Sequence, residues 1–386
     1  LAAALGSLEL ADAGARLWPG RGAGLAAAAL FNATLMLGAG CVLMTPDTPL
    51  LFFWVMGLWA LARLAAGGGA RWWLAAGGFA GLALLSKYTA VFLLAGAGLW
   101  ALTAAAIRPQ LRTAWPWAGL ALALLLFSPD IVWNAAHHWA SYRKQGSRVA
   151  GFDLGRSLQF LGELLGGQAL LFTPVIAVLA ARGLWRLGRE RSPGAALALW
   201  LSLPPAAIFL EHVLSGRVQA NWAVIIYPSA CLAAAAALPR RWLGAALASG
   251  FAVTALVYVQ AVAAPFPLPA ARDPAALQLA GWRDFAQAAA ASHPAFLTSD
   301  DYATAAALAY YAPRDVPVLG FGPRWQDFAW PMAAPDQPGL LILRGTGETC
   351  PDQLGTILRT RRGETAMSYR VCRFMAPGPG KIFPRP

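Results

Sequence analysis

The chain has 386 residues, of which 58% are hydrophobic and only 12% are charged, and its mean hydropathy is +0.52. Soluble domains usually carry about 25% charged residues, so this composition excludes an ordinary soluble enzyme and indicates a membrane protein. The formal net charge is +12, and the positions of the arginine residues decide what this charge means.

Apolar runs recur from residue 24 to residue 262. A transmembrane helix needs about 20 mostly apolar residues, and about 17 are still sufficient. We therefore predict about nine complete spans, the third of them short, preceded at residues 1–10 by the end of another span. The runs occupy residues 24–43, 49–65, 72–86, 89–106, 114–133, 165–181, 194–211, 221–238 and 243–262.

Arginine residues alternate regularly between the connections. Arg-rich connections precede the first full span and follow the second, fourth, sixth and eighth. Because Lys and Arg in short loops mark the cytoplasmic side, the other connections are predicted to face away from the cytoplasm. Membrane topology thus accounts for the positive charge, and we expect no nucleic-acid partner.

The stretch "LMTPDTPLLFFW" places one carboxylate, Asp47, between Pro46 and Pro49 in a short connection. Two interpretations are open. Asp47 is an N-cap of the following helix, a position that favours Asp. Alternatively, it faces a cavity, because a carboxylate near membrane depth is costly and usually has a function.

The later extracytoplasmic connections collect further polar and aromatic side chains. Lys87 in "LLSKYTAVF" either snorkels to the interface or meets a phosphate, and the aromatic residues either form an interfacial belt or stack on a sugar. Residues 153–164 are predicted to form an amphipathic surface helix. The candidate binding residues in these connections are Lys87, His137, Trp139, Gln145, Arg148, Arg217, Asn221 and Trp222.

Motifs of soluble enzymes and metal sites do not occur. There is no Walker loop, HExxH, GxSxG or CxxC. The adjacent pair His137 and His138 is not spaced for a metal on one helix face. We expect no cofactor, although the sequence leaves a divalent metal open.

The chain changes character after residue 262. The Pro-rich stretch "APFPLPAARDP" separates a predicted membrane domain, residues 1–262, from a soluble extracytoplasmic α/β domain, residues 263–386. Because such a domain lies in an oxidising compartment, Cys350 and Cys372 are predicted to form a disulfide. The elements expected are helices at 275–291 and near 301–312, and strands at 295–298, 316–319, 339–343 and 369–374.

Four stretches in order resemble landmarks of bacterial glycosyltransferase family 39 membrane proteins: "LMTPDTPLLFFW", "LLSKYTAVF", "WNAAHHWASYRKQGSR" and "RVQANWAVIIYP". These proteins are relatives of protein O-mannosyltransferases and of the aminoarabinose transferase that modifies lipid A. The resemblance, which covers about residues 1–290, implies a GT-C fold. It also implies transfer of a sugar from a polyprenyl phosphate to a lipid or protein acceptor, at the extracytoplasmic face of the bacterial inner membrane.

The resemblance assigns roles to the candidate residues. Asp47 corresponds to an acid near the reacting centre, which would orient or deprotonate the acceptor. Lys87 corresponds to a basic position near the lipid phosphate, whose charge a cation stabilises as it departs. The other residues that match the family and would bind substrate are His137, Trp139, Gln145, Arg148, Arg217, Asn221 and Trp222.

One part of the family pattern has no counterpart here. The family begins with a further helix and an acidic first loop, whereas Glu9 and Asp12 are predicted on the cytoplasmic side. We therefore expect an N-terminally incomplete copy of the catalytic unit, and its activity as it stands is left open. A transporter or flippase for a lipid or small solute is the alternative function, but the polar residues lie in loops on one face rather than at span midpoints. A non-catalytic scaffold derived from the family also stays open.

Overall fold

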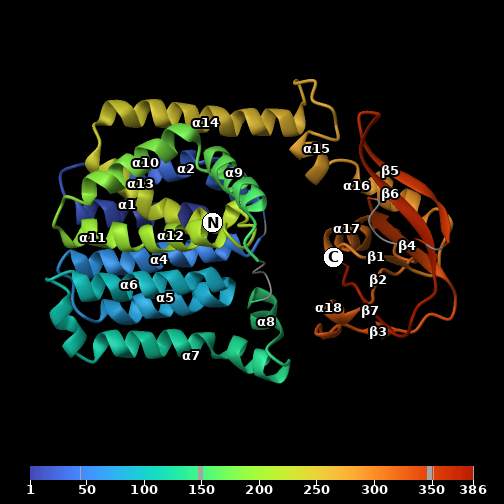
Figure 1. Cartoon of the computed structure of the whole chain (residues 1–386), viewed down its shortest axis with the longest axis horizontal. Coiled ribbons are helices and arrows are strands. Elements are labelled where there is room, and N and C mark those ends of the chain that lie inside the picture. Colours follow the sequence, from blue (N-terminus) through green and yellow to red (C-terminus); the bar gives the residue numbers. More distant parts are fainter. Residues whose placement is uncertain (44, 147–150, 346–349, 351, 386) are drawn as a thin grey trace. The chain divides into compact units, whose positions relative to one another are not determined.

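The computed structural model describes all residues except 44, 147–150, 346–349, 351 and 386. The chain consists of two compact units, Leu1–Leu256 and Val257–Pro386. The first is helical, and the second contains small β-sheets and short helices (Figure 1). The division falls inside the last predicted span, before the domain boundary predicted after residue 262.

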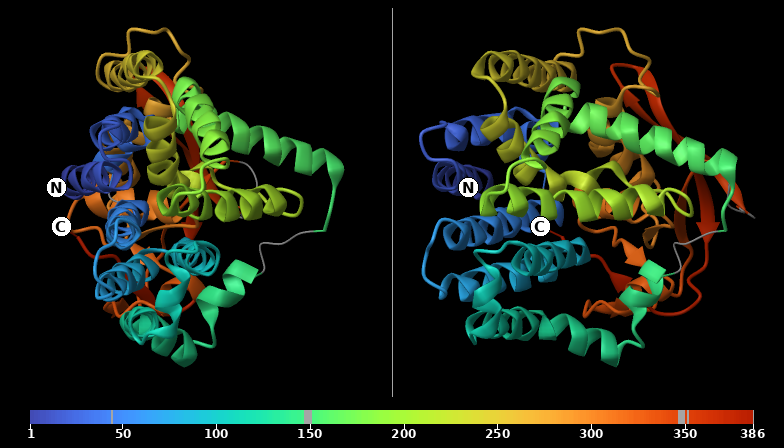
Figure 2. Two further views of the ribbon diagram at one scale, coloured as in Figure 1. Left: turned by 90° about the vertical axis from the view of Figure 1, so that its left-hand side faces the viewer. Right: turned by 60° about the vertical axis from the view of Figure 1, so that its left-hand side comes forward.

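The described part of the first unit is built mainly from helices, several of which lie side by side. Helices α4, α5 and α7 run roughly parallel, with α5 packed against both α4 and α7 (Figure 1), and Figure 2 views several helices along their axes. The α-helices are α1 (Ala2–Leu17), α2 (Ala23–Ala33), α3 (Leu35–Gly38), α4 (Asp47–Ala65), α5 (Trp72–Ser86), α6 (Val91–Thr103), α7 (Trp115–Ala136), α8 (Ala140–Gly146), α9 (Leu154–Leu171), α10 (Pro174–Leu187), α11 (Pro193–Trp200), α12 (Leu203–His212), α13 (Tyr227–Ala237) and α14 (Arg240–Val262). Four 3-10 segments are η1 (Gly40–Val42), η2 (Tyr88–Ala90), η3 (Arg108–Arg112) and η4 (Ala220–Ile226).

Five helical segments among the described residues are long and apolar enough to cross a membrane: Asp47–Ala65, Trp115–Ala136, Pro193–His212, Ala220–Ala237 and Arg240–Val262. Two bent pairs raise this number to as many as seven if each pair is one span. Helix α5 has the bounds of the predicted run 72–86 and α6 lies within the predicted run 89–106, but both are shorter than these five segments. The predicted total of about nine spans stays a prediction.

The predicted run 165–181 is not one straight helix. Helix α9 ends at Leu171, α10 begins at Pro174, and the two are bent by 101°. Proline disfavours helical geometry in the residue before it, and Thr173 has a φ of 59°. The predicted surface helix at 153–164 is therefore the first part of α9, which continues into the apolar run.

Helices α5 and α7 approach so closely that their contact requires glycine. A Cβ atom at Gly77 on α5 would collide with the backbone of Gly119 on α7. Small residues at such crossings let membrane helices pack backbone to backbone. Because the obstacle is backbone rather than a flexible side chain, the helices must separate to accept a larger residue.

We expect Gly77→Ala to lower the thermal unfolding temperature of the purified protein, since overpacking costs about 1–3 kcal/mol. The neighbouring Gly78→Ala is the control, because its Cβ would meet only Leu122, at an ordinary 3.6 Å. Equal unfolding temperatures for the two variants would contradict the proposed close packing.

The second unit contains two small sheets. The four-stranded sheet has the order β1-β4-β6-β5, with β1 parallel to β4 and the other pairs antiparallel, and the three-stranded sheet has the antiparallel order β2-β7-β3. The strands are β1 (Leu297–Ser299), β2 (Leu319–Gly320), β3 (Met332–Ala333), β4 (Gly339–Arg344), β5 (Gln353–Arg361), β6 (Glu364–Phe374) and β7 (Gly380–Ile382). The helices are α15 (Pro274–Leu279), α16 (Trp282–Ala290), α17 (Tyr302–Tyr311) and α18 (Pro323–Gln326).

The predicted elements of this unit are partly confirmed. Strands β1, β2, β4 and β6 overlap the four predicted strands, and α17 matches the predicted second helix. The predicted helix at 275–291 is two helices, α15 and α16, because the chain turns at Gly281 with a φ of 74°. Strands β3, β5 and β7 were not predicted.

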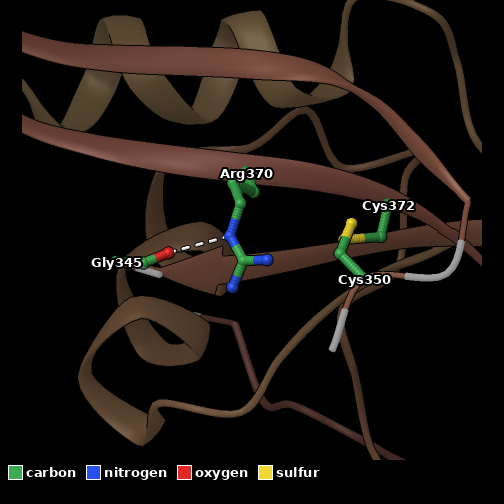
Figure 3. The surroundings of a disulfide bond; sticks show 4 residues. All are labelled: Gly345, Cys350, Arg370 and Cys372. Carbon is green, nitrogen blue, oxygen red and sulfur yellow. Dashed lines mark hydrogen bonds between the residues drawn. A yellow bond between two sulfur atoms is a disulfide. The ribbon is translucent and has the colours of Figure 1, made fainter. Parts of the chain in front are cut away.

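The predicted disulfide between Cys350 and Cys372 is confirmed (Figure 3). The two Cα atoms lie 5.8 Å apart, within the range of about 4.4–6.8 Å typical of disulfides. On the same strand, Arg370 donates a hydrogen bond of 2.8 Å to the carbonyl of Gly345. Both contacts connect β6 to the chain between β4 and β5.

Two arginine residues of β5 bind the C-terminal ends of helices. Arg359, only 1% exposed, donates to three backbone carbonyls at the end of α15. Arg361 donates to the last carbonyls of α14 and forms a 2.7 Å ion pair with Asp273, the N-cap of α15. Cations are favoured at helix C-termini, so these side chains fix both helices to the sheet.

Burial alone would raise the pKa of Asp273, but hydrogen bonds from Gln260 and backbone N–H groups, together with Arg361, outweigh burial and lower it. The charged Asp273 carboxylate therefore stabilises the fold fully above the ordinary Asp pKa of about 3.9. This stabilisation is lost as the pH falls through the lowered pKa that Asp273 has in the folded protein. Hydrogen exchange should show α15 losing protection on acidification below about pH 4. In the Asp273→Asn variant, the amides of α15 should be less protected from exchange at pH 6, and their exchange should change less with pH. Identical profiles would contradict the assignment.

Candidate functional site

A cavity of about 400 Å³ is lined by residues from four segments of the first unit. It contains five of the candidate residues named above, which are Asp47, Lys87, Gln145, Asn221 and Trp222. These positions are far apart in the chain, so the fold brings together connections that the arginine pattern predicted on one side of the membrane.

Asp47 is buried at this cavity and bound by two partners. The Lys87 Nζ lies 2.6 Å from its Oδ1, and the Asn221 Nδ2 donates to its Oδ2, also at 2.6 Å. The side chain of Asp47 is 5% exposed and that of Lys87 is 21% exposed. The carboxylate is thus held between a cation and an amide, with the cation more open to the cavity.

The capping interpretation of Asp47 is wrong. Asp47 is the first residue of α4, whose N-cap is Pro46, and no side-chain hydrogen bond caps this helix among the described residues. Both carboxylate oxygens are instead directed at Lys87 and Asn221. The position at a helix N-terminus still favours a negative charge, through the helix dipole.

Breaks in the helices present the two partners of Asp47. Lys87 ends α5 in an extended conformation, with a φ of −165°, before the 3-10 turn η2. Asn221 lies in the 3-10 segment η4, ahead of α13. The Thr48 hydroxyl donates to the Leu43 carbonyl at 2.9 Å and closes the loop before α4. Three interruptions of regular α-helix therefore meet at the carboxylate.

The site is suited to bind an anion beside a fixed carboxylate. An ammonium group has three donors, so Lys87 can hold Asp47 and still donate to an anion in the cavity. Each carboxylate oxygen of Asp47 has a further lone pair that can accept a proton or a hydroxyl hydrogen bond. Gln145, Asn221 and Trp222 add neutral donors and an aromatic face.

A second carboxylate next to the cavity was not among the candidates. The Tyr88 hydroxyl, which lines the cavity, donates to Asp130 at 2.9 Å, and the Tyr142 hydroxyl donates to it at 2.8 Å. Asn134 also donates to Asp130, at 3.2 Å. Asp130 follows Pro129 within an apolar run, just as Asp47 follows Pro46, and this repeated Pro-Asp pattern was the signal available in the sequence.

The corner between α7 and α8 depends on this network. His138 and Trp139 have φ values of 55° and 57°, which non-glycine residues adopt rarely and usually where surrounding contacts enforce them. Asn134 accepts backbone hydrogen bonds from Trp139 and Ser141. Burial and the hydrogen bond to Asp130 raise the pKa of Tyr142 to about 12, so its hydroxyl stays a donor. The corner turns α8 back so that Gln145 reaches the cavity.

Three other candidate residues, all of them described, do not line the cavity. His137 stacks on Trp133 with ring centroids 4.1 Å apart, and Trp139 stacks on Tyr142 at 5.7 Å. Arg217 forms a 2.7 Å ion pair with Glu163 on α9. Arg148 lies outside the described residues.

Metal ligands do not gather in the part of the chain that the structure describes. No group of three or more His, Cys, Asp or Glu side chains there could hold a metal ion. Asp47 and Asp130 are each bound by donors of the chain itself.

We expect Asp130→Asn to loosen the corner between α7 and α8. Hydrogen bonds to a charged group contribute about 1.5–3 kcal/mol each, so amide exchange in α8 should accelerate by about tenfold or more. Glu163→Gln is the control, because it changes an acid to an amide at an ion pair outside this network. Unchanged exchange in α8 would show that Asp130 does not hold the corner.

Two comparisons of the sequence with known proteins find similarity to part of the chain. A family model described as dolichyl-phosphate-mannose-protein mannosyltransferase matches residues 1–133. The lipid A galacturonosyltransferase RgtD of Rhizobium johnstonii is 27% identical over 202 residues, which are 52% of this chain and 42% of that protein. The chain thus spans less than half the length of this curated relative.

Two solved structures have a similar fold. ArnT from Cupriavidus metallidurans bound to undecaprenyl phosphate is 16% identical, with a TM-score of 0.57 over 96% of this chain and 83% of that chain. Its apo state is 18% identical, with a TM-score of 0.54 over 96% and 82% of the two chains. At these identities the similarity establishes the fold.

Proposed function

We propose that this chain is a glycosyltransferase, because a mannosyltransferase family model matches residues 1–133, a lipid A galacturonosyltransferase is similar over 52% of the chain, and ArnT has a similar fold. It moves a sugar from a polyprenyl-phosphate donor to a lipid acceptor at the extracytoplasmic face of the bacterial inner membrane. The observation that carries the proposal is the Asp47–Lys87 pair in a polar cavity at the helix ends.

The proposed donor is a sugar linked to a polyprenyl phosphate. One structure with the same fold is described as bound to undecaprenyl phosphate. Lys87 supplies the cation that such a phosphate requires, and its side chain is open enough to contact a ligand in the cavity. A lipid acceptor is preferred to a protein because a relative is named a lipid A galacturonosyltransferase.

The residues support a direct displacement at the sugar. An acceptor hydroxyl attacks the anomeric carbon, a new C–O bond forms, and the bond between that carbon and the phosphate oxygen breaks. The acceptor's proton passes to a base, for which Asp47 is the candidate, and the electron pair leaves with the polyprenyl phosphate. Lys87 stabilises the negative charge that develops on this phosphate. Asn221 fixes the carboxylate by its hydrogen bond.

The proposed topology places the cavity and the C-terminal unit outside the cytoplasm. Support comes from the arginine pattern, which assigns the connections around Asp47, Lys87 and Asn221 to one side, and from their joint contribution to one cavity. A transporter would instead line a path across the membrane with polar groups. The enzyme is therefore the better interpretation.

We expect Asp47→Asn to reduce sugar transfer by about 10²-fold, since a positioned acid or base contributes about 10²–10⁴-fold. The protein should be expressed from its complete genomic reading frame, in a host without a transferase of its own for lipid A. Mass spectrometry of extracted lipid A then measures the added sugar.

Glu163→Gln serves as the control and should keep nearly full transfer, because this residue does not line the cavity. Transfer at the wild-type rate by Asp47→Asn would remove Asp47 from the reaction. If the unaltered protein adds no sugar to lipid A, the proposed acceptor is wrong.

A further inference from the structure

The C-terminal unit has a cavity of its own, with a volume of about 470 Å³. It is formed by α17, α18 and the segments that follow α18 and β7, and the proposed sugar transfer does not use it. Its lining is dominated by six aromatic side chains: Tyr302, Tyr310, Trp325, Phe328, Trp330 and Phe383. None of the described residues that line it carries a charge.

The inner rings of this cavity support one another. Trp325 is 7% exposed, and its ring centroid lies 4.7 Å from that of Phe383. Trp330 lies 5.1 Å from Phe383 and 4.4 Å from Phe328. Contacts among several rings restrict the rotamers of each, so the aromatic surface is formed before any ligand arrives.

The outer rings of the cavity are unusually exposed for aromatic side chains. Tyr302 is 58% exposed, Tyr310 is 61% exposed and Phe328 is 41% exposed. Single exposed apolar residues need no explanation, but several on one hollowed surface indicate a binding site. Tyrosine and tryptophan each combine an apolar ring with a polar group at the edge.

We infer that this cavity binds the sugar rings of a neutral saccharide. A pyranose ring has apolar faces of C–H groups, which stack on aromatic rings, and hydroxyl groups at its edge. Tyrosine hydroxyls and the indole N–H of Trp330 are suitable partners for those hydroxyls. The volume lies within the range of about 300–1,000 Å³ found for small-molecule sites.

The lining also argues against other occupants. An anionic sugar or phosphate would be expected to find a cation, and none lines the cavity among the described residues. An acyl chain would contact the ring faces but would not use the polar groups at the edges of the tyrosine and tryptophan rings. The uncharged, amphipathic lining therefore matches an uncharged, amphipathic ligand.

A saccharide site suits an enzyme whose proposed acceptor is a glycolipid, because such an acceptor carries sugar rings. This role rests on the proposed function, but binding itself does not. The test therefore measures binding without donor or transfer, so that failure of the saccharide site and failure of the transferase proposal give different results.

The full chain is placed in phosphatidylcholine nanodiscs, because detergents with sugar head groups would compete for the site. Saturation-transfer NMR is recorded with maltose and with N,N′-diacetylchitobiose. We expect transfer to the pyranose C–H protons, and about tenfold weaker binding after the double substitution Tyr310→Ala and Phe328→Ala, which removes two exposed rings.

Phe266→Ala is the matched control, because Phe266 is 43% exposed in the same unit but does not line the cavity. It should bind both saccharides as the unaltered chain does. The inference is overturned if neither disaccharide receives saturation, or if the double variant binds as strongly as the control. Transfer from the cavity to lipid acyl protons instead, lost in the double variant, would make this surface a membrane contact and would equally overturn it.

Discussion

The ion pair between Asp47 and Lys87 is the constraint on which the membrane unit depends. A buried, unpaired charge costs several kcal/mol, and this chain has few charges to distribute. Pairing at 2.6 Å and a hydrogen bond from Asn221 satisfy the carboxylate and join α4, the end of α5 and η4. Removal of Lys87 would leave a buried carboxylate held by Asn221 alone, and removal of Asp47 would take away the contact that Lys87 and Asn221 share, so the geometry of the cavity and the packing of three segments are coupled.

A second carboxylate beside the cavity is also satisfied by donors of the chain itself. Asp130 receives the hydroxyls of Tyr88 and Tyr142 and so connects η2 to α8. Lys87 and Tyr88 are adjacent in the chain, so each carboxylate fixes one of two neighbouring residues. The cavity wall at Lys87 and Tyr88 is therefore fixed by an ion pair to Asp47 and by a hydrogen bond to Asp130, in a region otherwise stabilised by apolar packing.

Sequence patterns predicted the features that local composition determines. The apolar runs predicted where helices lie, and the arginine positions predicted on which side their connections lie. The Pro-Asp-Thr-Pro stretch identified Asp47 as a candidate. The pairing of Asp47 with Asn221 crosses 174 residues, and no local pattern specifies such a contact.

Local partners explain the candidates that do not line the cavity. Arg217 binds Glu163 and His137 stacks on Trp133, so polar character in a connection did not distinguish a binding residue from a structural one. Strand β5 was missed because Arg359 and Arg361 interrupt its apolar pattern, and their role at helix ends exists only in the folded chain.

The contacts of Asp47 also constrain how often the chain crosses the bilayer. Residues that meet on one face must be separated by an even number of crossings. Between Asp47 and Lys87, α4 is long and apolar enough to cross once, so we expect the short helix α5 to cross as well. The number of crossings between Lys87 and Gln145 must also be even, so α6 and α7 must both cross or both not cross. Between Gln145 and Asn221, the α11–α12 segment is long and apolar enough to cross once. An even number of crossings then requires the bent helices α9 and α10 to cross as well, as a broken span rather than a re-entrant loop.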